Sequence, residues 1–376
     1  MERIFNAYKI KYSILNHYLL PIRASRKVKS INIFVNIDDF YHKLHRPDTD
    51  REFQTTGKGA SKQVVSNLIN LAAHYKHWAV KEHLSPTIYL YYSTSKVFRN
   101  AMTLKDYRSY YNKISDINNP DFFYVNTAIS NSFSILQIIT KYIPRVYAID
   151  TNYIEPSVVP LYLSEITNAD FNLLISRDEY DLQYTHLDKW GLIIPKGEVS
   201  TFITSGTLWK YIQNKEKISY DFYYHPETFI WAKAIVGDKY RSIPKLTRTS
   251  WKTVIKFLEE FSSINDNSTE ILELQLRKLA DYITKKKIPD TDFNHNLTCT
   301  SITKQLDSLL EMDKIMIRQQ LTDMEDMQSL QQVNNTIFKG YPINLLFLLQ
   351  EHAPQNSQPH DDYFWRQMKG GYYNGI

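Results

Sequence analysis

The segment Ile31-Asn-Ile-Phe-Val-Asn-Ile37, followed directly by Asp38 and Asp39, indicates a buried strand that ends in two acids. Three further short apolar runs lie farther along the chain, at residues 87–92, 146–149 and 171–175. Stretches with helical spacing of apolar residues separate these four runs. Strands that alternate with helices form a mainly parallel sheet. The sequence therefore predicts an α/β fold, with a mainly parallel sheet flanked by helices.

Polar residues follow the predicted strands at the edge where ligands bind. In sheets of this kind, ligands bind at the carboxyl ends of the strands. The residues at or just after these ends are Asp38, Ser93, the loop 150–155 and Asp178. We expect one edge of the sheet to gather them into a single site.

Composition narrows the class of protein only modestly. The chain has 376 residues, with 45 Lys and Arg against 40 Asp and Glu, so any nucleic-acid partner must be argued from where the cations lie. The single cysteine, Cys299, excludes an intrachain disulfide and a cysteine-based zinc site. No stretch reaches the roughly 18 apolar residues of a membrane span. We expect no membrane partner and a cytoplasmic location, in a host cell or a virion if the source is viral.

The longest informative stretch lies between two predicted helices, residues 225–236 and 250–261. It reads Ala234-Ile-Val-Gly-Asp-Lys-Tyr-Arg-Ser-Ile-Pro-Lys-Leu-Thr-Arg-Thr-Ser-Trp-Lys-Thr-Val254 and predicts a helix–turn–helix. Trp190-Gly-Leu-Ile-Ile-Pro-Lys-Gly197 precedes it.

In their order, these segments resemble the 5′-nuclease family, which comprises flap endonucleases, phage 5′–3′ exonucleases and the 5′-nuclease domain of bacterial DNA polymerase I. The resemblance covers residues 31–261. It implies a PIN-like 5′-nuclease fold with a helix–turn–helix DNA-binding element and a helical C-terminal extension. The implied divisions are a basic N-terminal extension (1–30), the nuclease core (31–200), a helix–three-turn–helix-like element (201–262) and the C-terminal extension (263–376).

The resemblance also assigns a metal-binding carboxylate cluster. Its retained acids are Asp38 (or Asp39 in the alternative register), Glu155, Asp178 and Asp238. Five other family acids are replaced, by Ser93, Ser157, Val158, Tyr180 and Arg241. Active members hold two or more divalent ions, and Mg²⁺ requires several hard oxygen ligands. We expect a relic cluster that binds Mg²⁺ weakly or not at all, with Asp181 pointing elsewhere because it lies one residue out of register.

Two basic stretches predict contacts with DNA phosphates. The turn carries Lys239, Arg241, Lys245, Arg248, Lys252 and Lys256, with Lys245, Thr247 and Thr249 at the family's glycine positions. The segment 96–113 corresponds to the family's arch and includes Arg99 and Arg108 among aromatic residues that bases could stack on. Side-chain contacts with phosphates bind without sequence preference. The alternatives are a solvated charged face for the turn and an ordinary helical cap for residues 96–113.

Three functions are compatible with these features. The first is a DNA-binding protein, catalytically inactive or weak, that recognises branched or single/double-strand junction DNA in viral or phage replication or repair. The second is an active Mg²⁺-dependent 5′–3′ exonuclease or flap endonuclease. The third is a structural or virion assembly protein that reuses the fold.

The C-terminal third carries its own predictions. Apolar residues amid charged neighbours predict a long amphipathic helix over residues 301–333, and residues 344–349 add an apolar run. We expect this region to cap the core of a monomer, whose replication or virion partners are unknown. His74 and His77, spaced i, i+3, show no metal-ligand pattern and are expected on a helix surface.

Overall fold

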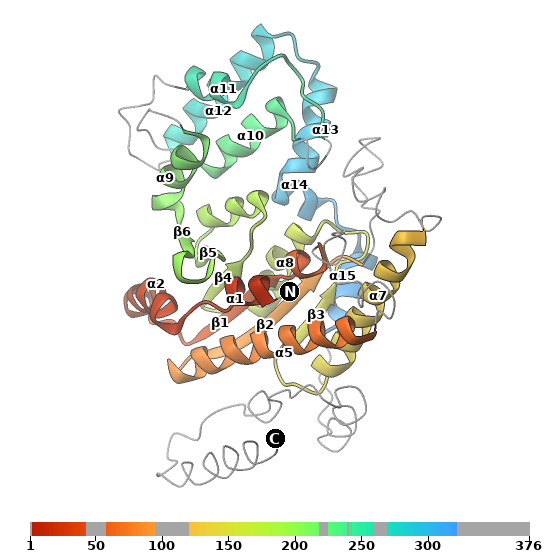
Figure 1. Ribbon diagram of the computed structural model, residues 1–376. Helices are drawn as coiled ribbons and strands as arrows, with labels where there is room; N and C mark the ends of the chain where they lie inside the picture. The colour runs from red at the N-terminus through yellow and green to blue at the C-terminus, as the bar shows by residue number, and fades with distance from the viewer. Residues whose placement is uncertain are drawn as a thin grey trace, which may run out of the picture.

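The computed structural model describes residues 2–42, 58–94, 120–217, 225–238, 241, 243–258 and 269–321 (Figure 1). Several predictions fall outside these residues: those for Arg99, Arg108 and Lys239, and those for the segments 322–333 and 344–349. Within the described part of the chain, no helix is both long enough and apolar enough to cross a bilayer.

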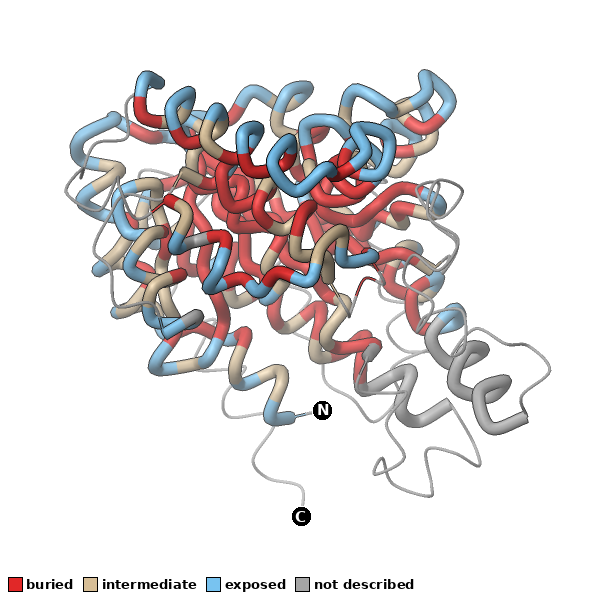
Figure 2. Tube along the Cα trace, turned by 90° about the horizontal axis from the view of Figure 1, so that it is seen from above, coloured by how far each residue is buried: buried red, intermediate tan, exposed pale blue. Residues whose placement is uncertain are grey.

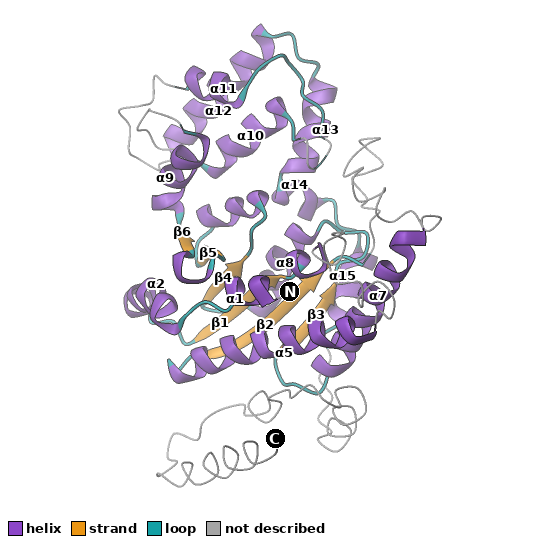
Figure 3. Cartoon of the chain, in the orientation of Figure 1, coloured by secondary structure: helices purple, strands orange, loops and turns teal. Residues whose placement is uncertain are grey.

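A six-stranded sheet forms the centre of the fold, in the order β3-β2-β1-β4-β5-β6 (Figure 3). The strands are β1 (Ser30–Asn36), β2 (Ser85–Tyr92), β3 (Val146–Asp150), β4 (Phe171–Ile175), β5 (Trp190–Ile194) and β6 (Thr201–Ile203). All neighbouring strands pair in parallel except β5 and β6, which are antiparallel. The predicted mainly parallel α/β fold is confirmed.

Residues of β1 alternate between two hydrophobic clusters, one on each face of the sheet. Ile33 and Val35 join one cluster and Phe34 joins the other, as the alternation of side chains along a strand requires. Both faces are covered, so every residue of β4 and β5 is buried. This explains why the strands appear in the sequence as continuous apolar runs. Figure 2 shows the buried residues at the centre of the molecule and the exposed residues around them.

The helices cover the sheet in two groups. The cluster that contains Ile33 is completed by α1 (Glu2–Tyr8), α2 (Tyr12–Arg26), α3 (Asp38–His42), α5 (Lys58–Lys81) and α7 (Pro120–Thr140). The opposite cluster is completed by η3 (Pro156–Val158), α8 (Val159–Thr167) and η4 (Glu179–His186), among other elements. The short turn η5 (Gly197–Val199) joins β5 to β6.

The N-terminal extension forms two helices that pack on the core. Tyr8, Ile10, Leu15 and Leu19 are buried, and α1 and α2 present their basic residues on the outside. Burial of these four apolar side chains holds the extension against the sheet, because transfer of apolar surface out of water is favourable.

A helical region lies at one end of the molecule (Figure 1). Its helices are α9 (Ser205–Glu216), α10 (Pro226–Val236), α11 (Trp251–Phe257), α12 (Thr269–Lys285) and α13 (Asp290–Thr300). α10 packs against α11, α12 and α13. The predicted helix–turn–helix is present as α10, a turn and α11, and the predicted C-terminal helical region continues from α12 into α14 (Ile302–Asp307) and α15 (Glu311–Gln319).

The prediction of one continuous helix from residue 301 is wrong. One helix ends at Asp307 and another begins at Glu311, where the Asp313 carboxylate accepts a hydrogen bond from the N–H of Leu310 (2.9 Å) as in a capping box. The apolar residues of this stretch also differ in exposure. Ile302 and Ile317 are buried, whereas Leu310 is 57% exposed.

Candidate functional site

Three of the predicted acids lie around the side chain and backbone of Arg241. Glu155 comes just before η3, Asp178 caps η4, and Asp238 follows α10. The Arg241 guanidinium forms ion pairs with Glu155 (Nη1 to Oε1, 3.3 Å) and with Asp178. Asp238 Oδ1 accepts a hydrogen bond from the backbone N–H of Arg241 (3.2 Å). The structure thus brings together acids that lie far apart in the sequence.

Arg241 is enclosed in this acid cluster, defined here as Glu155, Asp178, Asp181 and Asp238. Arg241 is 5% exposed, and its guanidinium carbon lies 3.7 Å from the centre of the Tyr180 ring. The Tyr180 hydroxyl donates to Asp238 Oδ2 (3.0 Å). A planar guanidinium suits such a site because it pairs with carboxylates and stacks on an aromatic face at the same time. Arg241 therefore supplies the positive charge that the buried acids need.

Asp181 belongs to the cluster, and the prediction that it points elsewhere is wrong. Asp178 caps a 3₁₀ helix, η4, in which residues three apart lie on the same side. Asp181 is fully buried. Burial raises its pKa well above the ordinary value, and the charge of Asp178 adds to this, whereas the Ser176 hydroxyl and Arg241 oppose it. The neutral form of Asp181 is therefore favoured more than that of an exposed carboxyl.

The pKa of Asp238 is shifted in the opposite direction to that of Asp181. Burial by itself raises the pKa of Asp238, but the charge and backbone N–H of Arg241 outweigh it, and the pKa lies below its ordinary value. Lys233 and the Tyr180 hydroxyl act in the same direction. Asp238 is thus an ionised acid, stabilised by its neighbours.

The acids after β1 lie near the N-terminal helix. Asp39 pairs with Arg177 (Oδ2 to Nη1, 3.1 Å) and accepts a hydrogen bond from the Tyr8 hydroxyl (3.0 Å). Burial raises the pKa of Tyr8, and the charges of Asp39 and Asp38 add to the effect. Asp38 begins α3, at the same edge of the sheet as Asp178, because β1 and β4 are parallel neighbours. Its part in the cluster stays a prediction.

The residues around Arg241 do not fit a site for two divalent ions. Glu155 and Asp178 are paired with a guanidinium, and burial of Asp181 disfavours the charged form that a metal ion needs. At three of the replaced family positions the side chains are buried and carry no charge: Ser93, Ser157 and Val158. Mg²⁺ needs several hard oxygen ligands in an open arrangement. Among the described residues, no group of three or more His, Cys, Asp and Glu is arranged to hold a metal ion.

The turn between α10 and α11 is fixed by backbone geometry. Gly237 has φ +74°, and a Cβ at this position would lie 2.7 Å from the Ile243 carbonyl oxygen and 2.8 Å from the Lys245 nitrogen. Asp238 and Ile243 exchange two backbone hydrogen bonds (3.0 and 2.8 Å). The Asn296 amide donates to the carbonyls of Ala234 (2.7 Å) and Pro244 (2.8 Å). A glycine is therefore required, and α13 holds the end of α10 and the turn together.

Four cations of this element face solvent: Lys245, Arg248, Lys252 and Lys256. None of them forms an ion pair with a residue that the structure describes. Arg241, predicted to contact phosphates, does not share this exposure. Its guanidinium is directed inward to Glu155 and Asp178, so that prediction is wrong for Arg241. Thr249, at a family glycine position, is buried and hydrogen-bonds with Tyr282.

His77 is exposed on α5, as predicted, but His74 is partly covered. His74 is half-buried against the N-terminal segment, and its Nε2 lies 2.6 Å from the Ile10 carbonyl oxygen. Burial lowers the pKa of His74 to about 4. His74 is a packing residue between α5 and the N-terminal segment. The prediction missed this because the segment that covers His74 could not be inferred from helical spacing.

No protein-family model matches the chain, and no curated protein sequence matches it. Solved structures do match. Bacteriophage T5 flap endonuclease, in a pseudo-enzyme–product complex with DNA and metal ions, is 13% identical with a TM-score of 0.48, over 82% of this chain and 98% of that one. T5 5′-exonuclease with bound divalent metal ions (zinc) is 12% identical with a TM-score of 0.44, over 83% and 100%. The catalytic core of Rad2 with DNA substrate is 9% identical with a TM-score of 0.40, over 84% and 90%.

The two T5 proteins are named as a flap endonuclease and a 5′-exonuclease, the kinds of enzyme that the sequence motifs resemble. Their identities and TM-scores are low. What this chain binds or catalyses is therefore inferred from its own side chains.

Proposed function

We propose that this protein binds DNA through the turn between α10 and α11, and that its acid cluster does not support metal-dependent cleavage. The observation that carries the proposal is the position of Arg241, buried between Glu155 and Asp178 and stacked on Tyr180. A bound guanidinium neutralises the acids that would otherwise attract divalent ions. The protein is, on this proposal, a catalytically inactive or weak relative of the 5′-nucleases.

The turn supports the binding half of the proposal. Lys245, Arg248 and Lys252 are exposed and form no ion pair within the described residues, so their charges are available to phosphates. Gly237 and Asn296 fix the backbone that carries these cations. Preorganised cations lose less conformational entropy on binding than cations on a loose loop. The resemblance to flap endonucleases extends the proposal to branched or single/double-strand junction DNA, in viral or phage replication or repair.

A binding titration with a paired control tests this half. Lys245, Arg248 and Lys252 are changed together to Ala, and the control changes the exposed Lys29, Lys141 and Lys304 to Ala, which removes the same charge elsewhere. Fluorescence anisotropy with flap, duplex and single-stranded DNA is measured over a range of salt concentrations. On duplex DNA, the logarithm of the association constant decreases with the logarithm of the salt concentration. The steepness of this decrease should be smaller by about 0.9 for each phosphate that the variant no longer neutralises. The turn variant should lose affinity for all sequences alike, and the control should bind like the parent.

If the turn variant binds as tightly as the parent, the helix–turn–helix is not the DNA-binding element. If the parent binds no DNA at low salt, the alternative of a structural or assembly protein gains support.

A cleavage assay tests the other half. The parent is incubated with a 5′-flap DNA and Mg²⁺, beside an Asp178→Ala variant that removes one acid of the cluster. We expect no cleavage above the level of the variant. Robust cleavage by the parent that Asp178→Ala abolishes would establish an active flap endonuclease and overturn the proposal.

We also propose that the chain acts as a monomer with its C-terminal helices on its own core. Gln320, just after α15, supports this, because its side chain joins α7 to the end of β3. Its Oε1 accepts from the N–H of Asp150 (2.7 Å) and from Gln137 (2.9 Å), and its Nε2 donates to the Asp150 carbonyl (3.0 Å). Size-exclusion chromatography with light scattering tests the monomer, and a stable dimer that dissociates on truncation before Ser301 would contradict it.

A further inference from the structure

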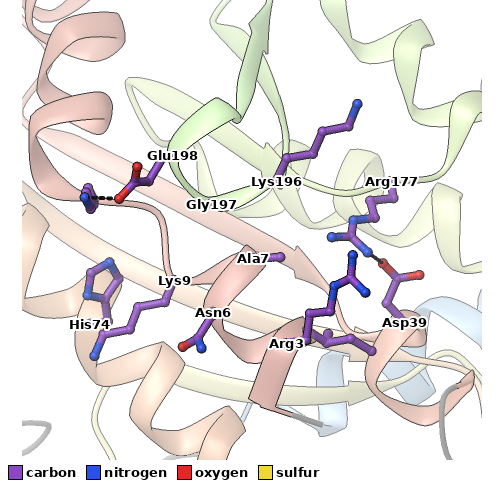
Figure 4. A pocket seen from close by; sticks show the side chains of 12 residues that line it. Arg3, Asn6, Ala7, Lys9, Asp39, His74, Arg177, Lys196, Gly197 and Glu198 are labelled. Carbon is purple, nitrogen blue, oxygen red and sulfur yellow. Dashed lines mark hydrogen bonds and ion pairs between the residues drawn. The ribbon is translucent and has the colours of Figure 1, made fainter.

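A cavity of about 980 Å³ lies between the N-terminal segment and the loop that joins β5 to β6 (Figure 4). Arg3 and Lys9 border it from the N-terminal segment, and Lys196 and Gly197 border it from the loop. The loop approaches α1 closely, since a Cβ on Gly197, at φ +69°, would lie 3.5 Å from the Asn6 carbonyl oxygen. The cavity is separate from the α10–α11 turn, and no described residue of that turn lines it.

Two acids line the cavity, and each is already neutralised. Asp39 pairs with Arg177 (3.1 Å), and Glu198 pairs with Lys11. Both pairs lie on the walls of the cavity, and Figure 4 shows the Arg177–Asp39 pair beside Arg3. The acidic charge of the walls is therefore balanced within the protein.

Three cations of the cavity have no acid partner among the described residues. Arg3, Lys9 and Lys196 are exposed, and none of them forms an ion pair with a residue that the structure describes. A concave surface lined by one sign of charge concentrates the field and attracts ions of opposite charge. The neighbouring histidine adds no charge at neutral pH, because burial, and to a smaller extent Lys9, lower the pKa of His74 to about 4.

We propose that this cavity binds phosphate groups of a nucleic acid strand, as a second contact area beside the α10–α11 turn. The size of the cavity and the distribution of its cations favour a strand over a single anion. Arg3, Lys9 and Lys196 stand at different points of the rim, an arrangement that suits successive phosphates of a strand (Figure 4). The pairing of Asp39 with Arg177 places the cavity beside the end of β1, the edge of the sheet where ligands bind in α/β folds. The inference deepens the proposed DNA-binding function, on which it rests.

The test uses the full chain with Arg3, Lys9 and Lys196 changed together to Ala. The control is the variant in which Lys29, Lys141 and Lys304 are changed to Ala, with the same loss of charge from exposed positions that do not line the cavity. Affinity for a labelled single-stranded oligonucleotide is measured against salt concentration. The cavity variant should bind at least about tenfold more weakly. The steepness with which its binding weakens with salt, on logarithmic scales, should be smaller by about 0.7 for each phosphate that is no longer neutralised. The control should keep the slope of the parent.

A second measurement does not depend on any variant. Lys9 and Lys196 of the parent are acetylated with an amine reagent, with and without the oligonucleotide, and the modification is read by mass spectrometry. The oligonucleotide should protect both lysines and leave Lys29 unprotected. Unchanged affinity of the cavity variant together with unprotected Lys9 and Lys196 would overturn the inference. Protection by pyrophosphate but not by the oligonucleotide would also overturn it, in favour of a small phosphorylated ligand.

The two proposals fail in distinguishable ways. If the α10–α11 turn variant binds like the parent while the cavity variant is weakened, the proposed role of the turn fails and the cavity stands. If the turn variant is weakened while the cavity variant behaves like its control, the cavity is not part of the DNA path.

Discussion

Arg241 and Lys245 lie in the same turn between α10 and α11, but they have opposite surroundings. Arg241 is buried among acids and an aromatic ring, whereas Lys245 is exposed and forms no ion pair within the described residues. A buried, paired cation serves the protein's own acids, and an exposed, unpaired one is available to an external anion. The difference teaches that a cation in a basic motif acquires its role from what lies beside it in the fold.

The largest effect is expected at Arg241. Replacement by Met removes the charge and keeps an extended apolar side chain, which leaves Glu155 and Asp178 without their partner. Breaking a buried ion pair from one side costs about 3–5 kcal/mol. Urea unfolding at neutral pH should show a loss of this size, and Arg241→Lys, the control that keeps the charge, should lose less. A loss from Arg241→Met no greater than that of an ordinary surface substitution would mean that the acids do not depend on Arg241.

A smaller effect is expected at Gly237, which sets the geometry of the exposed half of the turn. Gly237→Ala places a Cβ against backbone atoms of Ile243 and Lys245, at a φ that L side chains rarely adopt. Such backbone strain costs of order 1–3 kcal/mol, and the clash adds to it. Gly206→Ala is the matched control, because nothing lies within 4 Å of its Cβ position in α9. If both variants unfold at the same urea concentration as the parent, the turn is not held rigidly.

At neutral pH the smallest effect is expected at His225, the first residue of the helix–turn–helix, and this effect grows as the pH falls. His225 caps α10 by accepting a hydrogen bond from the N–H of Glu227 (3.1 Å), and burial, with the charge of His186, lowers its pKa to about 4. Because its pKa is lower in the folded state, His225 binds a proton more readily in the unfolded chain. The stability that this histidine contributes is therefore fully present above the pKa of the unfolded state and is lost as the pH falls towards 4. The loss is at most about 1.4 kcal/mol for each pH unit. His225→Asn keeps a good cap and cannot titrate, so its stability relative to the parent should rise as the pH falls from about 6.5 to about 4. A constant difference in stability between the variant and the parent across this range would contradict the pH-dependent role of His225.

The sequence predicted the sheet well because each strand is buried on both faces. Strand residues 171–175 were delimited correctly, and the runs at 87–92 and 146–149 lie within β2 and β3. The turn was predicted because Gly237 and the helices around it leave a local pattern. The prediction of one continuous helix from residue 301 was wrong because apolar spacing does not show the interruption between Asp307 and Glu311, where Asp313 caps the next helix through the N–H of Leu310.

The candidate site was predicted less completely, because its decisive contacts join distant segments. The motif placed Arg241 at a position where the family carries an acid, but it could not show that the Arg241 guanidinium turns away from solvent. Asp181 was misplaced because its segment forms a 3₁₀ helix, in which the third residue after Asp178 returns to the same side. The spacing of Asp178 and Asp181 was the available signal. The basic cavity left no local motif, since its walls come from segments far apart in the sequence: residues 3–11, Asp39, His74, Arg177 and residues 196–198.

The most direct test of the central claim is thermal unfolding of the parent with EDTA and then with increasing Mn²⁺ or Mg²⁺. A ligand that binds only the folded state stabilises it by about 2.7 kcal/mol at a hundred times its Kd. We expect the Tm of the parent to stay the same, because Arg241 occupies the acids, and we expect Arg241→Ala to gain Tm as divalent ions compensate for the missing charge. A saturating rise in the Tm of the parent would contradict the claim, because it would show that the acids bind metal while Arg241 is present.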